Sequence, residues 1–117
     1  MIVPRALRTL ASASLFLLAL GGLHLAAAPP PQPAAVEVKI DNFTFAPATL
    51  SVPAGTTVTW VNHDDIPHTV VSTDANKTFK SKVLDTDEKF IYVFAKPGRY
   101  PYFCSVHPKM TGEVVVK

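Results

Sequence analysis

One short segment, "CSVHPKM" at 104–110, carries three side chains that bind soft metal ions. Cys104, His107 and Met110 follow one another at steps of three, and Cys104 is the only cysteine among 117 residues. One cysteine cannot close an internal disulfide. Thiolate, imidazole and thioether together suit copper better than calcium or magnesium, which bind oxygen ligands. The segment therefore predicts a copper site.

The spacing requires a tight loop. A strand would place residues three apart on opposite faces, and Pro108 together with the flanking β pattern excludes a helix. We expect a loop between a strand that ends at Cys104 and a strand that starts near Gly112. The loop must curl so that its three side chains converge on one point.

A blue-copper arrangement needs a second imidazole, because it combines two imidazoles and a thiolate with a weak axial thioether. Beyond the N-terminal segment the candidates are His63 and His68. His68 follows Pro67 at the start of a β-branched segment. His63 lies in the polar turn "NHDD", where we expect it to be solvated. His68 is therefore the predicted fourth ligand.

The same residues have other interpretations. Cys104 and Met110 could be core residues, because free cysteine packs as a small hydrophobic group, and His107 could cap a turn. A Cys–His nucleophile is the enzymatic alternative, but it has no evident third group and leaves Met110 without a role. A four-ligand site also has no open position for a substrate. We therefore expect that the protein is not an enzyme.

Short alternating or β-branched segments surround these residues, and turn-forming residues separate them. The segments are 36–40, 56–62, 68–72, 89–95 and 112–117. Seven or eight strands without helical periodicity predict an all-β fold, an antiparallel β-sandwich. The large side chains expected in its interior are Phe43, Phe45, Trp60, Phe79, Phe90, Tyr92 and Phe94.

The first 28 residues contain two arginines followed by an apolar run, which is the order of a secretory signal peptide. An uncleaved membrane anchor is the alternative, because the run approaches the ~20 residues that a bilayer needs. We expect a signal segment at 1–28, a stiff proline-rich spacer at 29–35 and one folded domain at 36–117. The domain would then be periplasmic or otherwise exported.

The charge of the folded part excludes one class of partner. Without the two N-terminal arginines, nine of the eleven Lys and Arg residues remain against nine Asp and Glu residues. The domain is thus near neutral and has no basic field for nucleic acid. We expect a monomer that binds no nucleic acid.

Two longer segments, "VTWVNHDDIPHTVVS" and "GRYPYFCSVHPKMTGEVVV", resemble the cupredoxins, the type 1 blue copper proteins of the plastocyanin–azurin family. The short Cys-x-x-His-x-x-Met loop is similar to that of the amicyanin branch. The resemblance implies a Greek-key sandwich with one copper ion bound by His68, Cys104, His107 and Met110. It also implies an electron-transfer protein that shuttles single electrons between a redox protein donor and an acceptor.

We expect the partners to dock where His107 reaches the surface inside an apolar patch. The patch residues would be Ile66, Pro67, Val106 and Pro108. Copper carriage or storage is the alternative function. A carrier would use several methionines or histidines on flexible tails, whereas Met110 is the only methionine beyond the N-terminal segment. Electron transfer is therefore the predicted function.

Two positions depart from the cupredoxin pattern. Thr69 follows the first predicted ligand, where many relatives have an asparagine that links the two ligand loops. Pro101 falls inside the strand that leads to Cys104, and central strands tolerate proline poorly. We expect a bulge or a missing ladder bond at Pro101.

Overall fold

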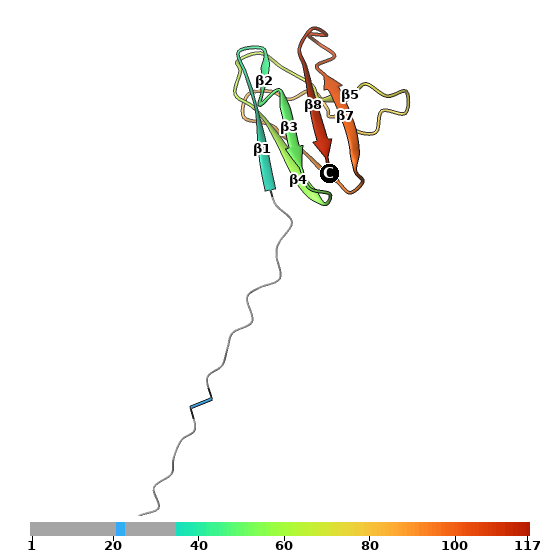
Figure 1. The fold of residues 1–117 in the computed structure, drawn as a ribbon. Helices are drawn as coiled ribbons and strands as arrows, with labels where there is room; N and C mark the ends of the chain where they lie inside the picture. The colour runs from blue at the N-terminus through green and yellow to red at the C-terminus, as the bar shows by residue number, and fades with distance from the viewer. Residues whose placement is uncertain (1–20, 23–34) are drawn as a thin grey trace, which may run out of the picture.

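The computed structural model describes residues 21–22 and 35–117, and residues 35–117 form a sandwich of two four-stranded sheets (Figure 1). The first sheet has the order β2-β1-β4-β6, with β1 at Ala35–Asp41, β2 at Thr44–Ala46, β4 at Thr56–Asn62 and β6 at Lys89–Phe94. The second has the order β3-β8-β7-β5, with β3 at Thr49–Val52, β5 at Val71–Ser72, β7 at Gly98–Phe103 and β8 at Thr111–Val116. The predicted all-β sandwich is confirmed.

The predicted signal segment and spacer lie outside the described residues, apart from Gly21, Gly22 and Ala35, the first residue of β1. Within the described part of the chain, no helix is long and apolar enough to cross a membrane.

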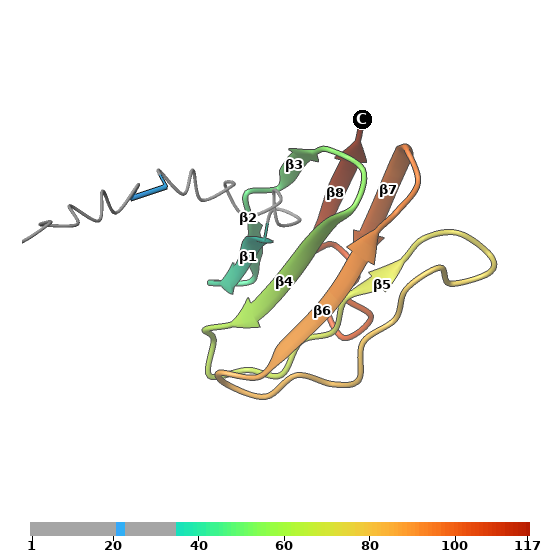
Figure 2. The ribbon, with the colours of Figure 1, turned by 90° about the horizontal axis from the view of Figure 1, so that it is seen from below.

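Both sheets are mixed. β1 pairs with β4 and β3 pairs with β8 in parallel, whereas the other four strand pairs are antiparallel. Figure 2 shows the resulting two layers, with β4 and β6 in front of β7 and β8. Side-chain alternation is the same in either direction, so the pattern predicted the strands and the layers but could not reveal the two parallel pairs.

The core lies between the layers and is centred on Trp60, whose side chain is fully buried. Its ring stacks on Phe79 at 5.9 Å between centroids and meets Tyr102 edge to face at 5.4 Å. Phe45 and Phe94 are buried as well, and Phe90 and Tyr92 pack against this core in partly buried positions. Large aromatic side chains bury the most apolar area per residue, so this cluster is central to stability.

Phe43 is the exception, and its predicted place in the interior is wrong: its side chain is 47% exposed. Asn42 and Phe43 have φ angles of 49° and 57° and join β1 to β2, where Asp41 pairs with Thr44. Positive φ at both central residues defines a type I′ hairpin turn, which usually contains Asn-Gly. The turn removes Phe43 from the strand alternation and turns its side chain to the surface.

Pro101 does not need the bulge that was one of the two irregularities expected for it. The β7–β8 register runs without a bulge from Gly98 opposite Val116 to Phe103 opposite Thr111. The Pro101 carbonyl accepts a hydrogen bond from Thr73 N at 3.0 Å, just beyond the end of β5. The backbone nitrogen of Pro101 therefore also faces that edge, so its missing N–H costs no bond to β8. The bond that proline cannot donate is the one back to Thr73, and the expected missing ladder bond lies there.

Candidate metal centre

The loop between β7 and β8 explains the equal steps of three. His107 N donates to Cys104 O at 3.2 Å, and Met110 N donates to His107 O at 2.9 Å. Cys104 N donates to Met110 O at 3.0 Å and closes the base of the loop. Consecutive bonds between residues three apart bring the side chains of those residues to one side. The loop thus curls as the sequence predicted.

His68 enters the site from the segment before β5. Its backbone N donates to Leu84 O at 3.0 Å, and its backbone O accepts from Leu84 N at 2.7 Å. Its side chain is fully buried. Both the N–H and the C=O of this histidine are therefore bound to one residue of a second segment, which fixes its backbone.

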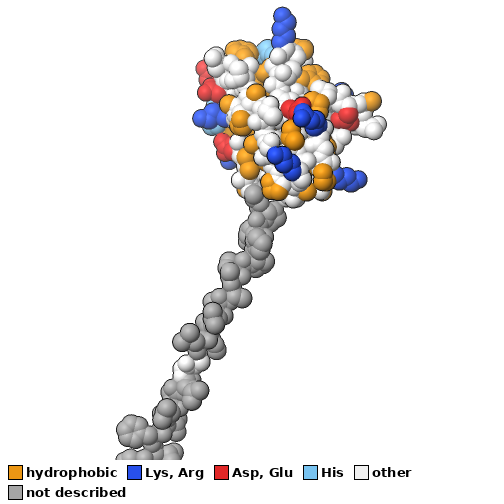
Figure 3. Space-filling model, in the orientation of Figure 1, with side chains coloured by type: hydrophobic (Ala, Val, Ile, Leu, Met, Phe, Trp, Pro, Cys, Tyr) orange, Lys and Arg blue, Asp and Glu red, His pale blue; other side chains and the backbone are white. Residues whose placement is uncertain are grey.

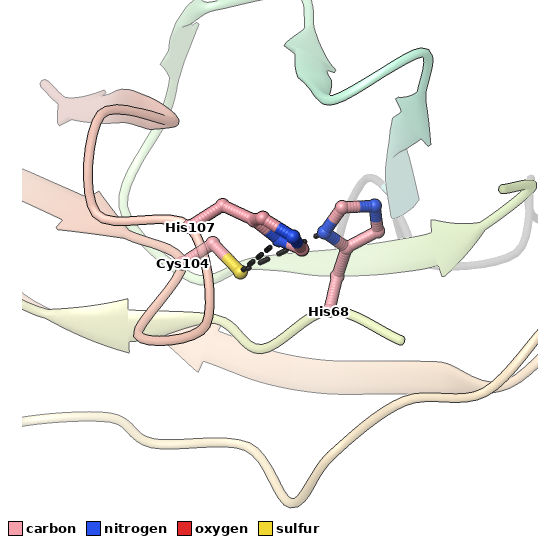
Figure 4. A group of neighbouring side chains, drawn as sticks. All are labelled: His68, Cys104 and His107. Atoms are coloured by element: carbon pink, nitrogen blue, oxygen red, sulfur yellow. Dashed lines mark hydrogen bonds between the residues drawn. The ribbon is translucent and has the colours of Figure 1, made fainter. Parts of the chain in front are cut away.

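The ligand atoms of three predicted residues come together, as Figure 4 shows. Cys104 Sγ lies 3.6 Å from His68 Nδ1 and 3.8 Å from His107 Nδ1, and the three atoms lie within 4.8 Å of one another. With metal–sulfur and metal–nitrogen bonds of about 2.3 and 2.0 Å, a trigonal site places sulfur and nitrogen about 3.7 Å apart. These donors can therefore share one ion.

The fourth predicted residue, Met110, is buried at the end of the same loop and belongs to the same core cluster as Cys104. A thioether is a soft donor that favours copper, whereas structural zinc sites use thiolate, imidazole or carboxylate. His63 lies apart from the group: its side chain is 38% exposed and its Nε2 is 3.8 Å from Glu37 Oε1. The donor set therefore fits one copper ion.

Asp64 sets the orientation of the His68 ring. Asp64 Oδ2 lies 2.7 Å from His68 Nε2, the ring nitrogen that does not face Cys104. An ionised carboxylate only accepts hydrogen bonds, so Nε2–H is the donor and Nδ1 keeps its lone pair for a metal. Sequence reasoning missed Asp64; the available signal was an acid four residues before the histidine.

The same carboxylate holds the β1–β2 turn. Asp64 Oδ1 accepts from Asn42 N at 2.6 Å, and Oδ2 accepts from Phe43 N at 3.0 Å. Partial burial acts to raise the pKa of Asp64, but the hydrogen bonds from Phe43 N, His68 and Asn42 N together lower it below its usual value. Asp64 is therefore ionised at neutral pH while it joins a predicted ligand to a surface turn.

Asn62 is a second residue that sequence reasoning missed. It is fully buried at the end of β4, and its Nδ2 donates to the carbonyls of Ile66 and Leu84, both at 2.9 Å. Its Oδ1 accepts from Asp64 N at 2.9 Å. These bonds fix the loop that carries both Asp64 and His68. In the sequence, an asparagine at the end of a strand indicates only an ordinary turn.

Cys104 lies in surroundings that favour its thiolate. Its side chain is fully buried, and burial alone would raise the thiol pKa. The hydrogen bond from Thr69 N and the contacts with His68 and His107 outweigh burial and lower the pKa of Cys104 to about 6. The thiolate is the form that binds metal, so the site is arranged for a cation.

Thr69 links the two ligand loops. Thr69 N donates to Cys104 Sγ at 3.4 Å. Thr69 Oγ1 accepts from Ser105 N at 2.8 Å and lies 2.7 Å from Ser105 Oγ. A hydroxyl and a backbone N–H thus join the His68 segment to the Cys104 loop.

The four residues predicted to surround His107 are all exposed: Ile66, Pro67, Val106 and Pro108. His107 itself is half-buried. The Phe43 ring meets the His107 ring edge to face at 5.0 Å between centroids, so a further apolar side chain lies beside this histidine.

A β-sandwich that gathers one cysteine and two histidines beside a buried methionine defines the class of mononuclear blue copper proteins. Residues 10–116 match the family model of the cupredoxin-like domain. The chain belongs to the cupredoxin family.

Individual relatives agree with this family. Amicyanin from Paracoccus versutus is 35% identical over 89 residues, which are 71% of this chain and 65% of that protein. A purple cupredoxin from Nitrosopumilus maritimus is 37% identical with a TM-score of 0.66, covering 70% of this chain and 99% of its own. The Cu(I) form of an amicyanin variant is 30% identical with a TM-score of 0.68, covering 75% and 87%.

Proposed function

We propose that this protein is a type 1 copper electron carrier in which His68, Cys104, His107 and Met110 would hold one copper ion. When bound, the copper ion gains and loses one electron. The observation that carries the proposal is the spacing of 3.6 and 3.8 Å between the sulfur and the two imidazole nitrogens. Donors already at trigonal spacing need little rearrangement between oxidation states, which favours fast electron transfer.

Two of the proposed ligands have separate structural supports. Asp64 and the backbone of Leu84 orient His68, and Thr69 N–H points at the Cys104 sulfur. His107 is half-buried and so connects the interior of the site to the surface. We infer that electrons enter and leave through the exposed edge of His107.

We infer that a redox protein donor and an acceptor dock on the exposed residues Ile66, Pro67, Val106 and Pro108. An apolar patch of this size gives a weak contact, as in other redox encounters, so each partner leaves quickly. On the face shown in Figure 3, acidic and basic side chains are interspersed with apolar ones. With a near-neutral domain, electrostatic steering of partners is weak. We propose that the carrier works as a monomer.

We further propose that the chain is exported, with a signal or anchor segment at 1–28, a spacer at 29–35 and the copper domain at 36–117. The charged-then-apolar order of the N-terminal sequence supports this proposal. Fractionation of a bacterial host and N-terminal sequencing of the product test it. A chain that stays in the cytoplasm with its N-terminus intact contradicts it.

The test of the copper proposal is to add copper(II) to the purified protein and record its visible and electron paramagnetic resonance spectra. We expect an intense blue or purple thiolate-to-copper band that Cys104→Ser abolishes. Reversible one-electron voltammetry with rapid self-exchange would support electron transfer as the function. Rapid handover of copper(I) to a chelator without reversible voltammetry would instead support copper carriage.

A further inference from the structure

Phe43 is a surface aromatic residue that the ligand set leaves without a role. Its side chain is 47% exposed, and its φ of 57° is unusual for a bulky residue. The second central position of a type I′ turn is normally glycine. The turn itself therefore does not explain why a phenylalanine occupies this position outside the core.

The Phe43 ring packs on both predicted histidine ligands. Its centroid lies 5.5 Å from that of His68 and 5.0 Å from that of His107, with interplanar angles of 87° and 89°. The two imidazole centroids are 5.0 Å apart. The three rings thus form a triangle in which Phe43 makes edge-to-face contact with each imidazole, a favoured aromatic geometry.

Asp64 fixes the position of this ring. Its carboxylate accepts the N–H groups of Asn42 and Phe43, which is how the chain holds two consecutive residues at positive φ. The same carboxylate accepts from His68 Nε2. The turn that carries Phe43 is therefore tied directly to one of the imidazoles on which its ring packs.

The two histidines differ in how they are held. His68 has a carboxylate on the nitrogen that faces away from Cys104. Among the described residues, the hydrogen-bonding contact of the His107 ring is with Cys104 Sγ at 3.8 Å, a long distance. The His107 ring also contacts the rings of Phe43 and His68, and these contacts restrain its orientation.

We propose that Phe43 is a positioning residue for the metal centre: its ring, fixed by Asp64, keeps His107 turned so that Nδ1 faces Cys104, with or without a bound ion. This inference rests on the proposed role of His107 as a ligand. It assigns a function to a side chain that is neither a ligand nor part of the core.

The test compares Phe43→Gly, Phe43→Leu and Phe43→Tyr, with Ile91→Ala as the control at another exposed apolar residue. Glycine suits the positive φ, so the Gly variant removes the ring and favours the turn. Leucine keeps apolar bulk at the same strained φ, and tyrosine keeps the ring. Thermal unfolding establishes that each variant folds.

The first readout is the NMR line shape of the His107 ring protons in the metal-free protein, above the ordinary imidazole pKa. We expect one narrow set in the wild type, the Tyr variant and the control. In the Gly and Leu variants we expect broadened or doubled signals, with an about three- to tenfold larger population of the rotated ring, the size that edge-to-face contacts allow. The second readout is copper release to a chelator, which should accelerate by a similar factor.

Unchanged His107 signals in both the Gly and the Leu variant overturn the inference, and so does a failure of tyrosine to restore the wild-type signals. If the Gly variant does not fold, the Leu variant decides alone. A wild-type protein that binds no copper refutes the proposed function instead. The metal-free measurement does not depend on that result, so the two failures are distinguishable.

Discussion

The carboxylate of Asp64 lies 2.7 Å from Nε2 of His68, while Nδ1 of the same ring lies 3.6 Å from the sulfur of Cys104. The two nitrogens of this imidazole therefore have separate roles. A carboxylate that accepts a hydrogen bond from Nε2 fixes the tautomer of the ring. It also makes Nδ1 more basic and so a stronger metal ligand. The negative charge also stabilises the more positive oxidation state of an ion held by the ring.

Asp64→Asn should weaken copper binding about 10- to 100-fold, the usual effect of losing such a partner of a ligand. It should also raise the reduction potential, because the charge that favours copper(II) is lost. Chelator competition and voltammetry measure the two effects. Asp65→Asn, at the exposed acid next in the chain, is the matched control. Equal affinities for the two variants would contradict the role of Asp64.

Thr69→Val should reduce the free energy of unfolding of the metal-free protein by about 0.5–1.5 kcal/mol, because the partly buried hydrogen bond from Ser105 N–H to the Thr69 hydroxyl is lost. The substitution preserves the shape of the side chain and removes the hydroxyl that joins the two ligand loops. Urea unfolding measures the change. Thr73→Val, at an exposed threonine, should alter stability little. A similar loss in both variants would mean that the loop link contributes nothing specific.

Met110→Gln should leave copper bound but lower the reduction potential, because an amide oxygen favours copper(II) more than a thioether does. Met110→Leu removes the thioether donor, preserves the buried apolar character and should raise the potential. Voltammetry of both variants measures whether each reduction potential rises or falls. A potential that rises in the Gln variant would show that Met110 is not a ligand of the ion.

The ligand loop was predictable from sequence because its geometry is local. Cys104, His107 and Met110 are joined by hydrogen bonds between residues three apart, so their spacing in the sequence indicates the shape of the loop. His68 could be chosen because proline and β-branched neighbours mark the start of an extended segment. The strand count and the layers followed from alternation in the same way.

The supports of the site were not predictable, because they depend on contacts between distant segments. Asp64 binds backbone groups 21 and 22 residues away in the β1–β2 turn. That turn places Phe43 at the surface, although its large apolar side chain favoured the interior. Pro101 likewise is tolerated because its backbone nitrogen faces the edge formed by β5 and Thr73, and not β8. Each outcome depends on which segment lies beside which.

Tyr102 predicts how stability changes at alkaline pH. Its ring is buried, and burial raises the pKa of Tyr102 to about 12; the neighbouring Trp60 indole acts in the opposite direction without completing a hydrogen bond to the phenol. Below pH 10 the phenol is neutral in both states. Between pH 10 and 12 the unfolded chain loses this proton and the folded protein retains it.

The free energy of unfolding should therefore fall over this range, by up to about 2–3 kcal/mol from Tyr102 alone. Tyr102→Phe keeps the buried ring and removes the ionisable group, so its stability should depend less steeply on pH across the same interval. Urea unfolding of the metal-free wild type and variant over a pH series measures the difference. If the two pH dependences coincide, the phenol already ionises in the folded protein, and the buried environment of Tyr102 does not disfavour its charge.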